Sequence, residues 1–189
     1  MKAKLNFRPS LKVGVACLLG LTLSVGAAYA VAPAAGTIIG NQASATYDLN
    51  GQTKTVLSNL VETRVDEVYA VDVTNPQTLA GTAGQTLYFP HTITNTGNAT
   101  DTFNLTSALS GQVSGVVIYP DLDGNGVPDS FTPITVTPAI LMGGTFKVLL
   151  AATINAGATA GQTGTATITA TSVNDGTRTD SNVDTVKVT

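Results

Sequence analysis

The chain is poor in the residues that most often carry chemistry. Its 189 residues include one cysteine, one histidine, no tryptophan and only nine lysines and arginines. The five basic residues beyond position 30 are spread out and form no basic patch, which disfavours nucleic-acid binding because neutralisation of phosphates dominates that affinity. The sequence also shows no nucleophile accompanied by a base and an orienting group, so we predict that the protein is not an enzyme.

The first 30 residues have the composition of a secretory signal peptide. Basic residues at positions 2, 4, 8 and 12 precede an apolar run over residues 13–27, and Ala28-Tyr29-Ala30 has the small-x-small pattern of a cleavage site. The alternative is an uncleaved membrane anchor, but the run is shorter than the roughly 20 residues that a spanning helix needs. We therefore expect export to the cell surface, periplasm or medium, with no membrane span after cleavage.

Cleavage after Ala30 would change the character of the chain. It would remove Cys17, the only cysteine, and leave five basic against twelve acidic residues, a formal charge of −7. The remaining residues are enough for one domain with a sizeable core. Without disulfides, an exported chain of this length must be stabilised by that core or by its partners.

Helix signals are nearly absent, and short runs of Thr, Val, Ile and Ala alternate between turn residues. In residues 85–95 the period of two places Leu87, Phe89, His91 and Ile93 on one face. In residues 163–172, alanine and isoleucine alternate with threonine, which suits an exposed strand face because its β-branch favours extended backbone. These patterns are typical of an antiparallel β-sandwich.

Eight strands are predicted between residues 66 and 189, enough for one Ig-like sandwich. They lie near residues 69–74, 85–95, 102–106, 113–119, 134–137, 145–154, 163–172 and 183–188. Turns are expected at "TNTGNATD", "SALSG", "INAGATAG" and "VNDG".

The stretch "LYFPHTITNTGNATDTFNLT" and the late "INAGATAGQTGTATITATSV" resemble a known family. They are similar to the Ig-like conserved repeat known as domain of unknown function number eleven, which is common in bacterial and archaeal surface proteins. The resemblance covers about residues 66–189 and implies the fold, while it says almost nothing about function. The chain departs from the usual pattern at Phe89-Pro90-His91 and in an acidic loop that follows residue 120.

Residues 31–65 form a separate N-terminal segment with a predicted β-hairpin from Thr37 to Val65. Its sequence resembles that of residues 164–188, although two low-complexity β sequences can also resemble each other by chance. The hairpin lacks preceding strands to cover its apolar face. We expect either that it folds back onto its own sandwich and extends the sheet near residues 66–74, or that it pairs with a copy or another envelope protein.

The acidic loop "DLDGNGVPD" has the oxygen-ligand spacing of an EF-hand-type calcium site. Position one is Asp121, followed by Asp123, Asn125, the Val127 carbonyl and Asp129 at positions three, five, seven and nine. The glutamate expected at position twelve is replaced by Thr132, so the loop is only a partial match. The alternative is a solvated turn, which Asp-Gly and Asn-Gly also favour.

These observations predict an exported structural or assembly subunit of a surface layer, fibre or matrix. Its partners would be other envelope proteins or copies of itself, joined by strand pairing, and calcium would be its one cofactor. The alternative is a binding module or adhesin that recognises a carbohydrate or protein through its end loops. The absence of tryptophan favours the structural role, because sugar-binding surfaces need exposed aromatic rings. His91, which shares a face with Leu87 and Ile93, is predicted to be a core residue.

Overall fold

The computed structural model describes residues 32–74 and 76–189, and all of its regular structure is β-strand. The predicted signal peptide, including Cys17 and the cleavage site, lies outside the described residues. Within them, no helix has the length and apolar character needed to cross a membrane.

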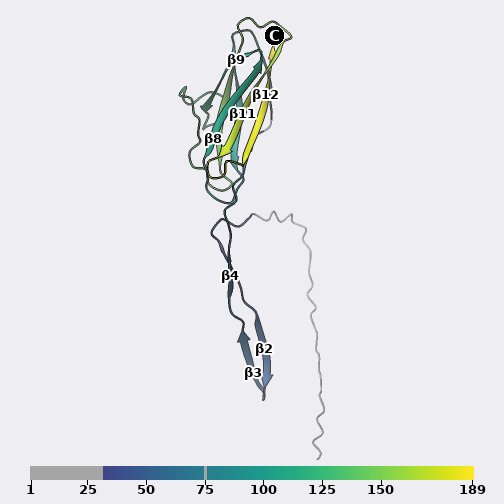
Figure 1. The fold of residues 1–189 in the computed structure, drawn as a ribbon, viewed down its shortest axis with the longest axis vertical. Helices are drawn as coiled ribbons and strands as arrows, with labels where there is room; N and C mark the ends of the chain where they lie inside the picture. Colours follow the sequence, from purple (N-terminus) through teal and green to yellow (C-terminus); the bar gives the residue numbers. More distant parts are fainter. Residues whose placement is uncertain (1–31, 75) are drawn as a thin grey trace, which may run out of the picture. The chain divides into compact units, whose positions relative to one another are not determined.

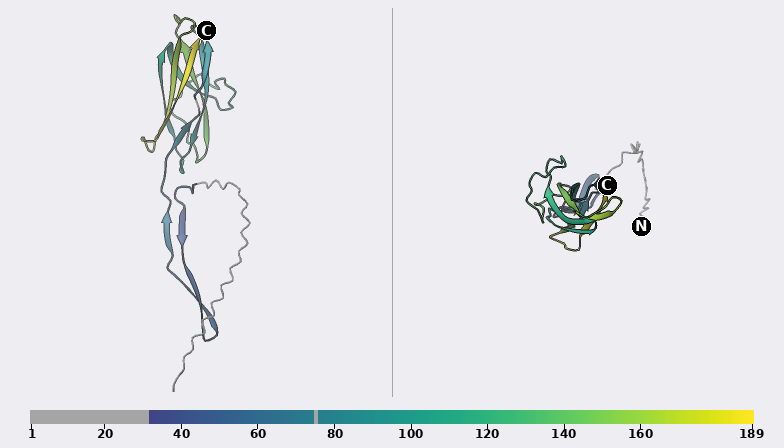
Figure 2. Two further views of the ribbon diagram at one scale, coloured as in Figure 1. Left: turned by 90° about the vertical axis from the view of Figure 1, so that its right-hand side faces the viewer. Right: turned by 90° about the horizontal axis from the view of Figure 1, so that it is seen from above.

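Two four-stranded sheets make the sandwich that the sequence predicts (Figure 1). The first sheet has the strand order β5 (Val71–Val73), β7 (Thr86–Asn95), β10 (Thr145–Ile154) and β9 (Val113–Pro120). The second has the order β6 (Thr78–Gly81), β12 (Thr179–Val188), β11 (Thr163–Ser172) and β8 (Phe103–Gly111). In both views of Figure 2 the two sheets form the layers of one sandwich.

The sandwich core contains the residues that the alternating sequence pattern places on one face of each strand. Leu87, Phe89, His91 and Ile93 of β7 are buried, and so are Ala166, Ile168 and Ala170 of β11. The intervening threonines of β11 are only half-buried, as alternation across a pleated sheet requires. The central strand β10 is buried on both faces near Leu149, which lies between Pro90 and Tyr119 on the neighbouring strands.

Three predictions about single strands are wrong. The "SALSG" segment, predicted as a turn, continues β8 to Gly111 because it pairs with Gly164–Ile168 of β11. Residues 134–137, predicted as a strand, form only an isolated bridge between Val136 and Asn104. Strand β6 was missed altogether, because four residues bounded by turns give too short a pattern to detect.

Strand β6 also departs from the predicted antiparallel arrangement, because it pairs with β12 in parallel. The chain leaves β5 at the edge of the first sheet and crosses to the edge of the second within residues 74–77. After this crossing, β6 runs in the same direction as β12. The first strand of the second sheet in chain order thus lies beside the last one.

Residues 38–64 form a separate pair of ladders, which we call the arm. Strand β1 (Ile38–Asn41) pairs with β4 (Val61–Arg64), and β2 (Ser44–Leu49) pairs with β3 (Gln52–Leu57). The β2–β3 turn is Asn50-Gly51, and both residues have positive φ, of 54° and 79°. This is the geometry of the type I′ hairpin turn, for which Asn-Gly is the preferred pair.

Every residue in the four strands of the arm is exposed. These strands pair only with one another among the described residues, and the sheet edge near residues 71–73 belongs to β5 and β7. The predicted hairpin is therefore present, but the fold-back that would extend the sheet at residues 66–74 is not observed. The physical reason is that β5 is only three residues long, so its free edge offers the hairpin few ladder hydrogen bonds.

Candidate functional site

The acidic loop that follows β9 brings its predicted ligands close together. Carboxylate oxygens of Asp121, Asp123 and Asp129 all lie within 4.8 Å of one another. Asp121 is buried, whereas Asp123 and Asp129 are exposed. The loop therefore has one carboxylate anchored in the fold and two at its surface.

Backbone amides that point inward hold the loop in this shape. The Asn125 amide donates to Asp121 Oδ1 and to Asp123 Oδ1, both at 3.1 Å, and the Gly126 amide donates to Asp121 Oδ2 at 3.3 Å. The Val127 amide donates to Asn125 Oδ1 at 2.7 Å. Gly124 and Gly126 have φ values of 74° and 81°, which glycine adopts without strain, so both can turn the chain around the carboxylates.

The donor set fits a hard cation in its chemistry. Carboxylate and amide oxygens on alternate residues of a tight loop are the ligands that calcium prefers, and Asp121, Asp123, Asn125 and Asp129 supply them here. Val127, whose carbonyl the sequence predicts as a ligand, is exposed. The same carboxylates also accept hydrogen bonds from the loop, as they would in an acidic turn, so calcium binding stays a prediction.

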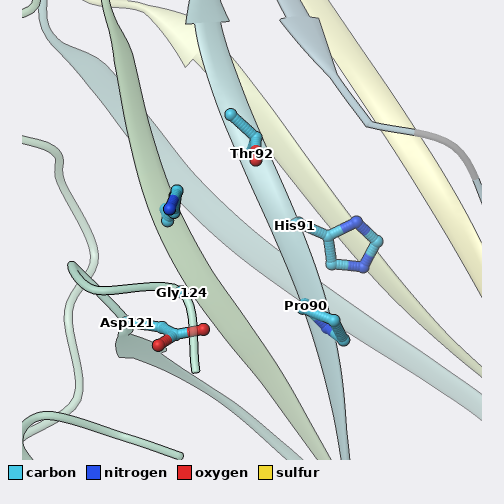
Figure 3. A pocket seen from close by; sticks show the side chains of 6 residues that line it. Pro90, His91, Thr92, Asp121 and Gly124 are labelled. Atoms are coloured by element: carbon cyan, nitrogen blue, oxygen red, sulfur yellow. The ribbon is translucent and has the colours of Figure 1, made fainter. Parts of the chain in front are cut away.

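Lys147 of β10 contacts this loop from the outer face of the first sheet. Its Nζ donates to the Asp123 carbonyl at 3.4 Å, and a β-carbon on Gly124 would lie 2.5 Å from that nitrogen. A cavity of about 170 Å³ lies here, lined by Pro90, Thr92 and Lys147 among others. In Figure 3 the ring of His91 points away from Asp121, as alternation along β7 requires.

His91 is buried, as predicted, but it has a carboxylate partner that the sequence did not reveal. Its Nε2 lies 2.7 Å from Asp184 Oδ2, and both side chains have no exposed surface. Its Nδ1 lies 3.3 Å from the Thr74 carbonyl oxygen. In this conformation neither side chain can contact a substrate.

The contact with His91 gives the buried Asp184 carboxyl group a polar partner at hydrogen-bond distance. A fully buried acid needs such a partner, because an isolated charge in the core is costly.

This pair belongs to a row of polar side chains on β12 that holds the crossing between the sheets. Asp184 Oδ1 accepts the Gln77 amide at 2.9 Å, and Asp180 Oδ2 accepts the Val73 amide at 2.7 Å. The Asn182 amide group donates to the Thr74 carbonyl. The row therefore replaces the ladder bonds that a chain leaving one sheet for another loses.

An aromatic pair with one exposed ring lies beside the acidic loop. Phe131 is 67% exposed, and its ring packs edge-on against the half-buried Tyr119 at a centroid distance of 5.7 Å. This pair was not predicted from the sequence. In the sequence, Phe131 is marked only by the polar residues on either side of it, and this is a weak indication of an exposed ring.

Comparison with family models gave no match, and comparison with curated proteins gave none. Among solved structures, the chain is similar to the PapD-like domain 7 of human CEP192, with 16% identity, a TM-score of 0.40, and coverage of 63% of this chain and 84% of that one. It is also similar to AggA, the major subunit of aggregative adherence fimbriae type I from Escherichia coli, with 14% identity, a TM-score of 0.36, and coverage of 66% and 96%.

A third similar structure is a family 123 glycoside hydrolase from Clostridium perfringens. Its identity is 8%, its TM-score is 0.45, and the match covers 65% of this chain but only 27% of the hydrolase. Similarities at this level assign no activity to the chain. The resemblance to the Ig-like repeat family stays a prediction, while the all-β sandwich is shown by the structure itself.

Proposed function

We propose that the protein is an exported, non-enzymatic subunit of a cell-envelope assembly, such as a surface layer, fibre or matrix. Its sandwich is the rigid body, and its arm makes contact with copies of itself or with another envelope protein. The observation that carries this proposal is an arm with an apolar face that nothing in the described chain covers.

The register of the arm separates its residues into two unlike faces. Ala45 pairs with Val56, Tyr47 with Lys54 and Leu49 with Gln52, so the three apolar residues of β2 and Val56 share one face. The opposite face contains Thr46 paired with Thr55 and Asp48 paired with Thr53, and Leu57, paired with Ser44 at the end of the ladder, is its one apolar residue. Tyr47, Leu49 and Val56 are each about half exposed.

An isolated pair of strands with such a face is marginally stable in water. Its free edges and exposed apolar surface favour pairing with another chain. Because a contiguous apolar face on a monomer usually marks an interaction surface, association is the state in which this arm is stable.

The proposal is tested with matched substitutions on the two faces of β2. Tyr47→Lys places a charge on the apolar face, while Thr46→Lys places the same charge on the polar face one residue away. Since burying a large side chain is worth about 1.5–3 kcal/mol, we expect Tyr47→Lys to raise the concentration at half-assembly at least tenfold. Sedimentation of the full chain measures this concentration.

Thr46→Lys is expected to assemble as the unmodified chain does. A full chain that stays monomeric at all concentrations, or two variants with equal effects, would contradict the proposal. Circular dichroism of each variant confirms that the sandwich is intact.

The second candidate function is a binding module, and the Phe131–Tyr119 pair beside the acidic loop favours it. An exposed ring next to oxygen-rich side chains is a surface on which a sugar can stack. Such a role would depend on the loop and not on the arm. The Tyr47→Lys variant separates the two candidates, because it leaves the aromatic pair unchanged.

A further inference from the structure

The four edge strands of the sandwich differ in how well they are protected. β5 and β6 have three and four residues, and short edge strands give a second chain little to pair with. β8 and β9 have nine and eight residues, and residues 102–120 contain no charged side chain. Long uncharged edges are the kind that monomeric proteins avoid, so this side of the sandwich is suited to pairing.

The core is incompletely covered along the same edge. Phe103 and Leu105 of β8 point inward and are buried, but Ser107 and Leu109, which have the same phase, are exposed. Leu109 is 46% exposed although it pairs with Ala166, a fully buried residue of β11. Beyond residue 105, the inward face of β8 is therefore not covered by other residues of the described chain.

A segment of the same chain shows how extended backbone binds between these two edges. The Ile134 amide donates to the Ile118 carbonyl of β9 at 3.0 Å, and Thr135 accepts from the Leu105 amide of β8 at 2.8 Å. Ile134 packs against the core. A groove of about 370 Å³ lies beside this segment and is lined by Leu105, Ser107 and Val116 among others.

Among the described residues, nothing pairs with the outer edge of β8 from Thr106 to Gly111. This open stretch and strand β2 of the arm both have six residues. β2 presents Ala45, Tyr47 and Leu49 at every second position, which is the pattern of a strand with one face on a core.

We propose that β2 of one copy pairs with the open edge of β8 in a second copy. Its apolar face then covers Leu109 and Val116, and its polar face continues the outer surface of the second sheet. The inference rests on the proposed function and adds the surface that binds the arm, which is the open edge of β8. Because each copy has one arm and one acceptor edge, the contact is head to tail and propagates as a fibre unless it closes into a ring.

Crosslinking between two single-cysteine chains tests the contact. Thr46 and Ala108 are exposed, and both would lie on the outer face of the joined sheet. Full chains carrying Cys17→Ser with either Thr46→Cys or Ala108→Cys are mixed and treated with a short bifunctional thiol reagent. We expect a crosslinked pair that contains one chain of each kind.

Thr46→Cys mixed with Val183→Cys is the matched control, because Val183 is exposed on β12, an internal strand of the same sheet. We expect no crosslink from this mixture. If the chains assemble but the Thr46–Ala108 crosslink is absent or no stronger than the control, the acceptor is wrong and the proposed function stands. If the chains do not assemble, both proposals fail.

A pair of charge substitutions gives an independent measurement. Leu109→Lys places an ammonium group at the open edge, and Val183→Lys places one on a surface of similar exposure. We expect Leu109→Lys to raise the concentration at half-assembly about tenfold or more, since it removes one buried leucine contact. Equal effects of the two variants, with both chains folded, would overturn the proposal.

Discussion

Asp121 and Asp123 have different tasks although they stand two residues apart. Asp121 is buried and accepts amides of the loop, so it is part of the fold, whereas Asp123 is exposed and can change without opening the core. A test of calcium binding should therefore substitute Asp123. Substitution of Asp121 would lower the stability of the fold itself, so a change in calcium affinity could not be separated from a change in folding.

We predict that calcium raises the melting temperature of the full chain and that Asp123→Ala removes the effect. A loop with few carboxylates has an expected affinity on the order of 10⁻⁴ to 10⁻³ M. Millimolar calcium should then stabilise the folded state by about 1 kcal/mol. For a domain of this size the shift is roughly 2–4 °C, which calorimetry with calcium and with chelator measures.

Asp48→Ala provides the control, because Asp48 is an exposed acid of the arm. It should keep the full calcium shift. Superimposable curves with and without calcium, or the same shift in Asp123→Ala, would establish the loop as an acidic turn.

The residues of this site illustrate what sequence spacing can and cannot predict. The three aspartates lie within nine residues, so a local pattern was enough to bring them together. His91 and Asp184 are 93 positions apart, and their contact depends on which strands face each other across the sandwich. A period of two predicts that His91 is buried, but it cannot predict its partner.

At the scale of elements, the end of β8 and its connection to β9 in the other sheet are the least expected part of the fold. The sequence predicts that β8 ends at residue 106, because small and polar residues follow it. The strand continues because β11 supplies a partner along its whole length, and pairing outweighs weak local preference. The connection from β8 to β9 turns at Gly111, which has a φ of 63°.

We predict that Gly111→Ala destabilises the sandwich by roughly 1–3 kcal/mol, because a side chain at positive φ is strained. A β-carbon there would also lie 2.6 Å from the Thr163 carbonyl oxygen, a backbone atom that cannot move freely. Urea denaturation of the full chain measures the loss as a lower midpoint.

Gly115→Ala is the matched control, at a nearby glycine in β9. Gly115 has no positive φ, and a β-carbon there would meet no atom within 4 Å. Its midpoint should stay close to that of the unmodified chain. Equal midpoints for the two variants would show that the turn relaxes without cost.

At the scale of the molecule, the sandwich and the arm differ in what stabilises them. Within the described part of the chain, every buried apolar residue of the core lies at position 73 or beyond, and the strands of the arm are fully exposed. The sandwich should therefore keep its fold without the arm. The boundary at residue 65 that the sequence predicts stays a prediction.

We predict that a chain beginning at Asp66 is a folded monomer. Its thermal unfolding should stay cooperative, and its melting temperature should fall only by a few degrees. The truncation removes no buried apolar residue of the described core, although it does remove hydrogen bonds such as that from the Ala35 amide to the Asn98 carbonyl at 2.9 Å. Calorimetry measures the cooperativity of unfolding, and sedimentation measures whether the chain is a monomer.

Loss of cooperative unfolding in the shortened chain would mean that the arm belongs to the core. Assembly that persists without the arm would exclude the arm as the contact between copies.

The parallel pairing of β6 with β12 has a mechanical consequence. A force that pulls on the arm reaches the sandwich first at β5, which pairs with β7, and reaches β6 only through the crossing that follows. A force on the C-terminus reaches β12, so any force transmitted to β6 acts in the opposite direction along the ladder that the two strands share. Their hydrogen bonds are then sheared and must break together, not one after another. The Gln77 amide bond to Asp184 adds to this resistance, because it joins the crossing to the last strand. Once the β5 pairing has opened, a chain linked at its N-terminal end would thus bear tension in shear along this parallel pair.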